Sequence, residues 1–131
     1  HLILNCVGRT GYPRRSLVLC RDHAWSIDPV AEAGDHLASL LRLYSRGLTL
    51  PLKFFPETSW HYAQQVHLGQ KRGDEAMASA RRIWTGNDIY AGEGANAAYR
   101  LCFRDADPID DEFREIADGI FVPLVANLTK I

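Results

Sequence analysis

Hydrophobic side chains in the first half of the chain recur at intervals of three and four residues. The positions in this pattern are Leu37, Leu40, Leu41, Tyr44 and Leu48. This spacing aligns side chains on one face of an α-helix. Because Asp28 and Pro29 precede the pattern and Gly47 is a typical stop after a last turn, it predicts a helix over about residues 31–46.

Similar patterns predict four further helices, over about residues 58–68, 74–85, 95–103 and 110–128. Thr58 or Ser59 is expected to cap the first of them. The last begins with acidic residues, which suit the positive end of a helix dipole. Pro123 is expected to kink that helix, because it removes a backbone donor.

Two short apolar runs, residues 16–20 and 24–28, predict the strands of a β-hairpin with Asp22 and His23 in the turn. Residues 1–7 are apolar without a clean period, which leaves a strand and a helix end open. A hairpin followed by about five helices predicts a helix-rich α+β fold. The length of 131 residues fits a single domain over 1–131.

A proline-flanked aromatic segment lies between the first two long helices. Pro51 and Pro56 forbid a helix across residues 48–56. Phe54 and Phe55 are large apolar side chains that should be buried. We therefore predict a structural anchor made of Phe54, Phe55, Pro56, Trp60 and Trp84.

The composition is that of an ordinary globular protein, with 47% hydrophobic and 24% charged residues. A net charge of −1 argues against a free-standing nucleic-acid-binding protein, which would usually be basic. Cys6, Cys20 and Cys102 share no C-x-x-C spacing, so reduced thiols in a cytoplasmic protein fit better than disulfides or a zinc ribbon. Because the chain opens on His1 and apolar residues, we expect it to be a fragment of something longer.

No arrangement of catalytic residues stands out. A nuclease-type metal site needs converging carboxylates with a lysine nearby, and no strand with an acid-x-Lys motif occurs. His23, Ser26 and Asp28 suggest a triad, but strand spacing does not bring them together, so a turn histidine and a capping aspartate are the better interpretation. We predict no catalytic residue and no metal site.

Three pairs of adjacent basic residues are the remaining polar candidates: Arg14 and Arg15, Lys71 and Arg72, and Arg81 and Arg82. Such pairs can contact DNA phosphates or a partner protein. Basic pairs interleaved with acids are more often a solvated face, so both interpretations stay open.

Residues 43–60 resemble the RecC family, the gamma subunits of exodeoxyribonuclease V. The likeness rests on a helix that ends in Gly-Leu and on the stretch Pro-Leu-Lys-Phe-Phe-Pro, followed by Trp60. Further segments are similar to later parts of that family, in the right order: residues 80–86, 107–113 and 123–124. The resemblance covers roughly residues 16–128.

The resemblance implies that residues 1–8 are a helix end. It also implies a degenerate nuclease domain, similar to the PD-(D/E)XK fold, whose catalytic set is lost. The implied assembly is a heterotrimer with RecB-like and RecD-like subunits that processes double-stranded DNA ends in repair and recombination. No cofactor is expected in this fragment, whereas ATP and Mg²⁺ are expected in the partner subunits.

Three functions therefore stand as alternatives. The first is a non-catalytic scaffold and interaction domain, which the absence of a catalytic motif favours. The second is an active nuclease of the same fold, and the third is a free-standing DNA-binding domain. Release of nucleotides would distinguish the second, and salt-dependent binding to DNA the third.

Overall fold

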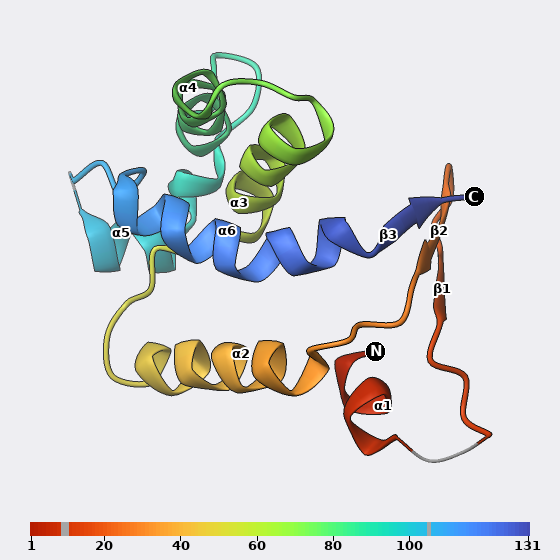
Figure 1. The fold of residues 1–131 in the computed structure, drawn as a ribbon. Coiled ribbons are helices and arrows are strands. Elements are labelled where there is room, and N and C mark those ends of the chain that lie inside the picture. Colours follow the sequence, from red (N-terminus) through yellow and green to blue (C-terminus); the bar gives the residue numbers. More distant parts are fainter. Residues whose placement is uncertain (9–10, 105) are drawn as a thin grey trace. The chain divides into compact units, whose positions relative to one another are not determined.

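The residues that the structure describes, 1–8, 11–104 and 106–131, form six α-helices and three strands in this computed structural model (Figure 1). The α-helices are α1 (Leu2–Val7), α2 (Ala33–Gly47), α3 (Pro56–Ala63), α4 (Gly73–Thr85), α5 (Ala97–Phe103) and α6 (Asp111–Ala126). The strands are β1 (Ser16–Leu19), β2 (Ala24–Ile27) and β3 (Leu128–Lys130). A π-helix, η1 (Gln64–Leu68), extends α3, and a 3-10 turn, η2 (Glu93–Ala95), precedes α5. The predicted helix-rich α+β fold is confirmed.

The chain divides into two compact units. The first comprises His1–Thr49 together with Pro123–Ile131, and the second comprises Leu50–Val122. The boundary near the C-terminus falls at Pro123, inside α6. None of the described helices is long and apolar enough to cross a membrane.

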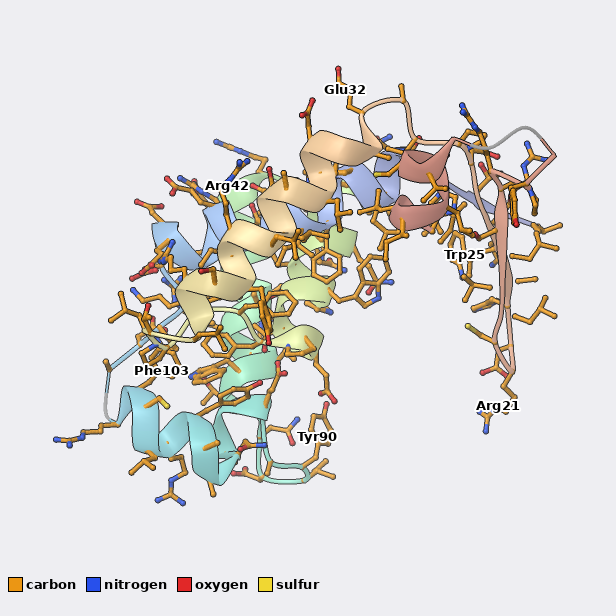
Figure 2. All side chains as sticks on the ribbon, turned by 90° about the horizontal axis from the view of Figure 1, so that it is seen from below. Arg21, Trp25, Glu32, Arg42, Tyr90 and Phe103 are labelled. Carbon is orange, nitrogen blue, oxygen red and sulfur yellow. The ribbon has the colours of Figure 1, made fainter. Side chains whose placement is uncertain are left out.

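The sheet of the first unit is antiparallel, in the order β1-β2-β3. Arg21 lies in the turn of the β1-β2 hairpin (Figure 2). Strand β3 corrects the prediction that the last helix runs to residue 128. The helix ends at Ala126, and the carbonyl of Asn127 already accepts a hydrogen bond from the amide of Asp28, at 2.8 Å. Pairing with β2 therefore overrides an apolar pattern that continues through Leu128.

Residues 2–7 are a helix, as the family resemblance implied. Polar contacts fasten this short helix to the rest of the first unit. The His1 ring lies 2.8 Å from the Ser16 hydroxyl and 2.9 Å from the carbonyl of Asp28. The side chain of Asn5 accepts from the amide of Val30 and donates to the carbonyl of Arg14. These hydrogen bonds satisfy backbone groups that would otherwise lack a partner.

Helix α2 carries the first predicted apolar pattern, but much of that face is exposed. Leu41, Tyr44 and Leu48 are 58%, 66% and 70% exposed. Within its unit α2 packs against α1, which has only six residues. A helix of that length cannot cover a stripe that runs over three turns, since each turn advances about 5.4 Å.

The second unit has the larger hydrophobic core. Helix α3 packs along α4, and the alanines at 63, 76 and 80 are fully buried, which lets the two backbones approach closely. The apolar face of α6 closes the core. Its central cluster consists of Phe55, Tyr62, Ala76, Met77, Ala80, Ile109, Phe113 and Ala117.

The start of α3 differs from the prediction. The helix begins at Pro56, a residue suited to the first helical position, so Thr58 and Ser59 lie inside the first turns. Its free amides are instead satisfied from far along the chain. The carboxylate of Glu93 accepts from the amide of Glu57 at 3.2 Å and from the amide of Thr58 at 2.7 Å. A negative group here also matches the positive end of the helix dipole.

The loop that presents Glu93 depends on close packing around two glycines. Gly86 ends α4 with a φ of 77°, and a Cβ there would lie 2.1 Å from the amide nitrogen of Gly92. A Cβ on Gly94 would lie 2.6 Å from the indole ring of Trp84. Only glycine fits either place, so the loop is held against α4.

We predict that Glu93→Ala lowers the free energy of unfolding by about 1–2 kcal/mol, the usual cost of a lost N-terminal cap. Two amides of α3 would lose their acceptor, and the helix would lose a favourable charge. Urea unfolding followed by circular dichroism measures the change. Glu115→Ala, an exposed carboxylate on α6, is the matched control and should cost less than about 0.5 kcal/mol. Equal effects of the two variants would contradict the capping role.

Candidate functional site

Four aromatic rings surround the side chain of Phe55, which has no exposed surface. The ring centroids of Trp84, Tyr99, Phe103 and Phe113 lie 4.2, 5.0, 5.4 and 6.1 Å from that of Phe55. Tilted and edge-on pairs at such distances add to the free energy of burial. Because these rings come from α4, α5 and α6, one side chain at the start of α3 connects all four helices of the second unit.

The other members of the predicted anchor are less buried. Phe54 and Trp60 are half-buried and both pack on Phe121, with centroids 6.1 and 5.2 Å away. Pro56 is exposed at the start of α3, where its contribution is its fixed φ angle. Trp84 is half-buried and joins the Phe55 cluster. The structure thus gathers Phe55 and Trp84 in one cluster, while Phe54 and Trp60 lie in another with Phe121.

Lys53 connects the segment before α3 to the start of α6. Its ammonium group donates to the carboxylate of Asp110 and lies 3.1 Å from that of Glu112. Burial by itself would raise the pKa of the Asp110 carboxyl. The hydrogen bond from Lys53 and the amide of Phe113 outweigh that effect, and together they hold the pKa below its ordinary value. The same hydrogen bond to Asp110 raises the pKa of Lys53.

Asp118 on α6 forms a second polar connection. Its carboxylate lies 3.1 Å from the ring nitrogen of His67, on the π-helix, and accepts a long hydrogen bond of 3.4 Å from the Tyr62 hydroxyl. Burial, followed by the negative charge of Asp118, raises the pKa of Tyr62 to about 12. A π-helix is an uncommon geometry that often marks a functional position. Local sequence spacing does not reveal these contacts, because the partners lie more than fifty positions apart.

The three basic pairs have different surroundings. In the first unit, Arg15 forms an ion pair with Asp28 at 2.9 Å. In the second, Arg81 is fully engaged, because its guanidinium donates to Asp107 at 2.8 Å and to the carbonyl of Ile109 at 2.6 Å. Arg14, Lys71, Arg72 and Arg82 are exposed, and within the described part of the chain they have no carboxylate partner.

Lys71 and Arg82, from two different pairs, both act on His61. The His61 ring on α3 lies 2.8 Å from the Ser79 hydroxyl on α4. Burial, followed by the charges of Lys71 and Arg82, lowers the pKa of His61. Lys71 follows the π-helix that extends α3, and Arg82 lies three residues after Ser79 on α4, so one member of each of these two pairs belongs to a segment next to the α3-α4 contact.

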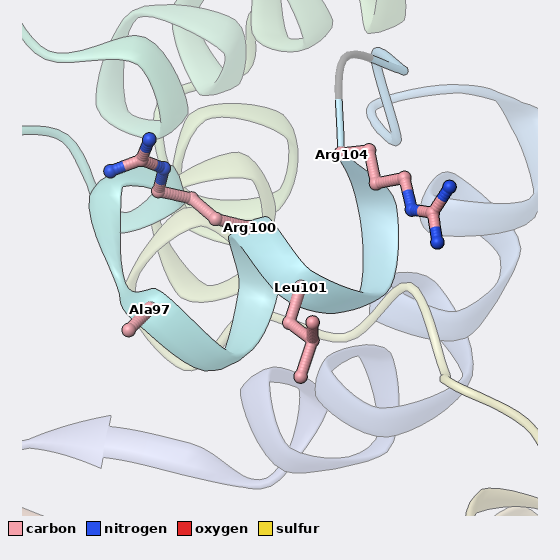
Figure 3. A pocket seen from close by; sticks show the side chains of 4 residues that line it. All are labelled: Ala97, Arg100, Leu101 and Arg104. Atoms are coloured by element: carbon pink, nitrogen blue, oxygen red, sulfur yellow. The ribbon is translucent and has the colours of Figure 1, made fainter.

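Other groupings of polar side chains are weaker. No three histidine, cysteine, aspartate or glutamate side chains among residues 1–8, 11–104 and 106–131 gather as they would around a metal ion. A surface hollow of about 470 Å³ on α5 is lined by Ala97, Arg100, Leu101 and Arg104. Figure 3 shows the two arginines extending in opposite directions, so they do not converge on one ligand.

A family model described as the RecC C-terminal domain matches residues 1–67, just over half of the chain. The chain belongs to the RecC C-terminal domain family. RecC is a subunit of exodeoxyribonuclease V, an enzyme of DNA repair and recombination, so the predicted family is confirmed. No curated protein matches the chain.

The match defines which part of the resemblance is shown. It contains the whole of the first segment that suggested RecC, residues 43–60, including the Phe55 anchor. The later segments, from residue 80 onward, lie outside it. Their likeness to RecC stays a prediction.

We predict that Phe55→Ala lowers the free energy of unfolding of this RecC domain by about 3–5 kcal/mol, as removal of a buried phenylalanine usually does. The cavity left by the ring would be bordered by four helices, so the movement of a single helix could not fill it. Chemical denaturation measures the change, with Leu101→Ala, a leucine 77% exposed, as control. A loss below about 1 kcal/mol for Phe55→Ala would contradict the anchor role.

The Lys53–Asp110 contact predicts a dependence of stability on acid pH. Because the pKa of Asp110 is lowered in the folded chain, the unfolded chain takes up its proton first. The contribution of Asp110 is present at neutral pH and is lost as the pH falls through its folded-state pKa. In Asp110→Asn, unfolding midpoints measured between pH 7 and pH 3 should fall less than in the parent. Asp88→Asn, an exposed loop residue, should leave the profile unchanged.

Proposed function

We propose that this RecC domain is a non-catalytic scaffold and interaction domain of exodeoxyribonuclease V, the ATP-dependent helicase-nuclease that processes double-stranded DNA ends. Its partners in this proposal are the RecB-like and RecD-like subunits, in the cytoplasm. ATP and Mg²⁺ are assigned to those subunits and not to this chain. The proposed likeness to a degenerate PD-(D/E)XK nuclease rests on the family alone.

The observation that carries the proposal is the exposed apolar stripe of α2. The half-buried Leu37 and the exposed Leu41, Tyr44 and Leu48 follow one another at intervals of four, three and four residues. Helices that pack against another helix along a seam have this spacing. Ala38 and Ser45, which flank the stripe, are small and allow a second backbone to come close. We infer that a helix of a partner subunit covers this stripe, because exposed apolar surface of this kind marks protein interfaces.

The edge of the sheet supports the same proposal. The hydrogen bond from the Cys20 amide to the His23 carbonyl fixes which residues of β1 bond to β2. By the alternation of an antiparallel pair, the backbone groups of Leu17 and Leu19 face the other way. Their side chains are exposed, and no described strand pairs with that edge. An open apolar edge strand is suited to receive an extended segment from another chain.

The polar side chains of the second unit support a structural role over a hydrolytic one. Asp107, Asp110 and Asp118 each hold a basic residue of another segment, and Glu93 caps α3. A metal-dependent nuclease needs carboxylates that are directed at a common cation. Here each of the four carboxylates contacts a different partner in the unit, and each contact joins two segments of the chain.

The interaction role predicts a specific loss of assembly. Tyr44→Glu in the full RecC subunit should abolish or strongly reduce co-purification with RecB-like and RecD-like subunits, because a charge would have to be buried in the helix contact. Leu101→Glu places the same charge at an equally exposed leucine of α5 and should leave assembly unchanged. Circular dichroism of both variants checks that they fold. Normal assembly of the Tyr44 variant would refute the proposed contact between α2 and a helix of a partner subunit.

The non-catalytic part of the proposal is tested separately. The purified chain with Mg²⁺ and labelled linear DNA should release no nucleotides above the level of a no-protein control. Release of nucleotides that follows the protein peak through chromatography would favour the alternative of an active nuclease. The assembly result and the nuclease result can fail independently.

A further inference from the structure

The edge of the α3-α4 contact in the second unit combines hydrogen-bonding groups with unpaired positive charge. His61 and Ser79 are both half-buried and lie within hydrogen-bonding distance of each other across the two helices. The imidazole has a second ring nitrogen, and the hydroxyl can both donate and accept. The pair therefore has further hydrogen-bonding capacity for a group that arrives from solvent.

Two cations belong to segments that adjoin this pair. Arg82 follows Ser79 by three residues on α4, which places both on the same side of the helix. Lys71 enters from the loop after the π-helix, where its amide donates to the carbonyl of Gln65 at 2.9 Å. Gln65 is one turn beyond His61. Burial, followed by the charges of both cations, lowers the pKa of His61, which agrees with this placement.

Nearby carboxylates do not neutralise these cations. Glu57 and Glu75 lie one turn before His61 and Ser79 on their helices, and neither forms an ion pair with Lys71 or Arg82 among the described residues. Lys71 and Arg82 therefore have no ion-pair partner among the described residues.

We propose that Lys71 and Arg82, together with the His61–Ser79 pair, form a binding site for a phosphate group. A phosphate carries the charge and the several acceptor oxygens that two cations and the one free N–H or O–H donor of the pair can bind together. The group can come from free phosphate or from the phosphodiester backbone of a nucleic acid. This site is separate from the apolar surface of the first unit proposed for subunit docking.

The first test follows the pKa of His61 by NMR titration of the purified chain. In a chloride buffer the pKa should lie below that of a model histidine. At matched ionic strength, inorganic phosphate should raise it in a saturable way, because the bound anion offsets the charges of Lys71 and Arg82. The signals of His23 and His36, in the other unit, should not follow.

Two double variants make this test specific. K71A/R82A should raise the pKa of His61 without phosphate and abolish its response to phosphate. R100A/R104A removes two cations from α5 in the same unit and should preserve the response. No response in the parent chain, or an equal loss in both variants, would overturn the proposal.

The second test separates the two sources of phosphate. A short single-stranded oligonucleotide is titrated against the same proteins over a range of salt concentrations. Tighter binding than to inorganic phosphate, with a shallower salt dependence in K71A/R82A only, would assign the site to a nucleic-acid backbone. Binding of inorganic phosphate without binding of the oligonucleotide would assign it to a free phosphate group. If neither ligand binds, or oligonucleotide binding is the same in K71A/R82A, the site is refuted.

Discussion

The side chain of Phe55, at the start of α3, contacts aromatic rings from α4, α5 and α6. It stands immediately before α3, where proline at the next position starts the helix without needing a free amide. Trp84, Tyr99, Phe103 and Phe113 close around it. Because protein interiors are packed as densely as organic crystals, a ring shared by four elements fixes their spacing together and not one pair at a time. The polar contacts of the unit are consistent with this arrangement, since each connects elements that the aromatic cluster has already brought close.

Local patterns in the sequence predicted the helices and helix ends that depend on neighbouring residues in the chain. Ala76 and Ala80 of α4 follow a helical period, as do Phe113, Ile116 and Ala117 of α6, and these residues are buried. Gly86 ends α4 as a stop residue should. What the sequence could not predict depends on distant partners. The cap of α3 comes from Glu93, more than thirty residues away, and β3 forms because β2 offers it an edge, although its own pattern continues a helix.

The basic pairs show the same limit in the candidate site. Arg81 and Arg82 are equivalent in sequence, but successive residues on a helix point about 100° apart. Arg81 therefore meets Asp107 and a backbone carbonyl, while Arg82 stays exposed and its charge contributes to lowering the pKa of His61. A sequence pattern identifies a pair of basic residues. Only the packing of the helices shows which of the two forms an ion pair within the unit. The grouping of Lys71 with Arg82, taken from two pairs, could not be read from either pair alone.

The two units differ in how many of their apolar and charged side chains find partners within the unit. This difference supports the proposed function. In the second unit the aromatic residues, apart from the exposed Tyr90, pack on one another, and several carboxylates have partners inside the unit. In the first unit, Val30 and Ala33 are the buried hydrophobic residues among those described, while Leu41 and Tyr44 of α2 and the leucines of β1 are exposed. A unit of this size gains stability mainly from buried apolar area, and it buries little by itself. Covering the α2 stripe and the β1 edge would therefore stabilise the first unit and bind a partner in the same step, which is the physical reason to assign the interaction role of this RecC domain to that unit.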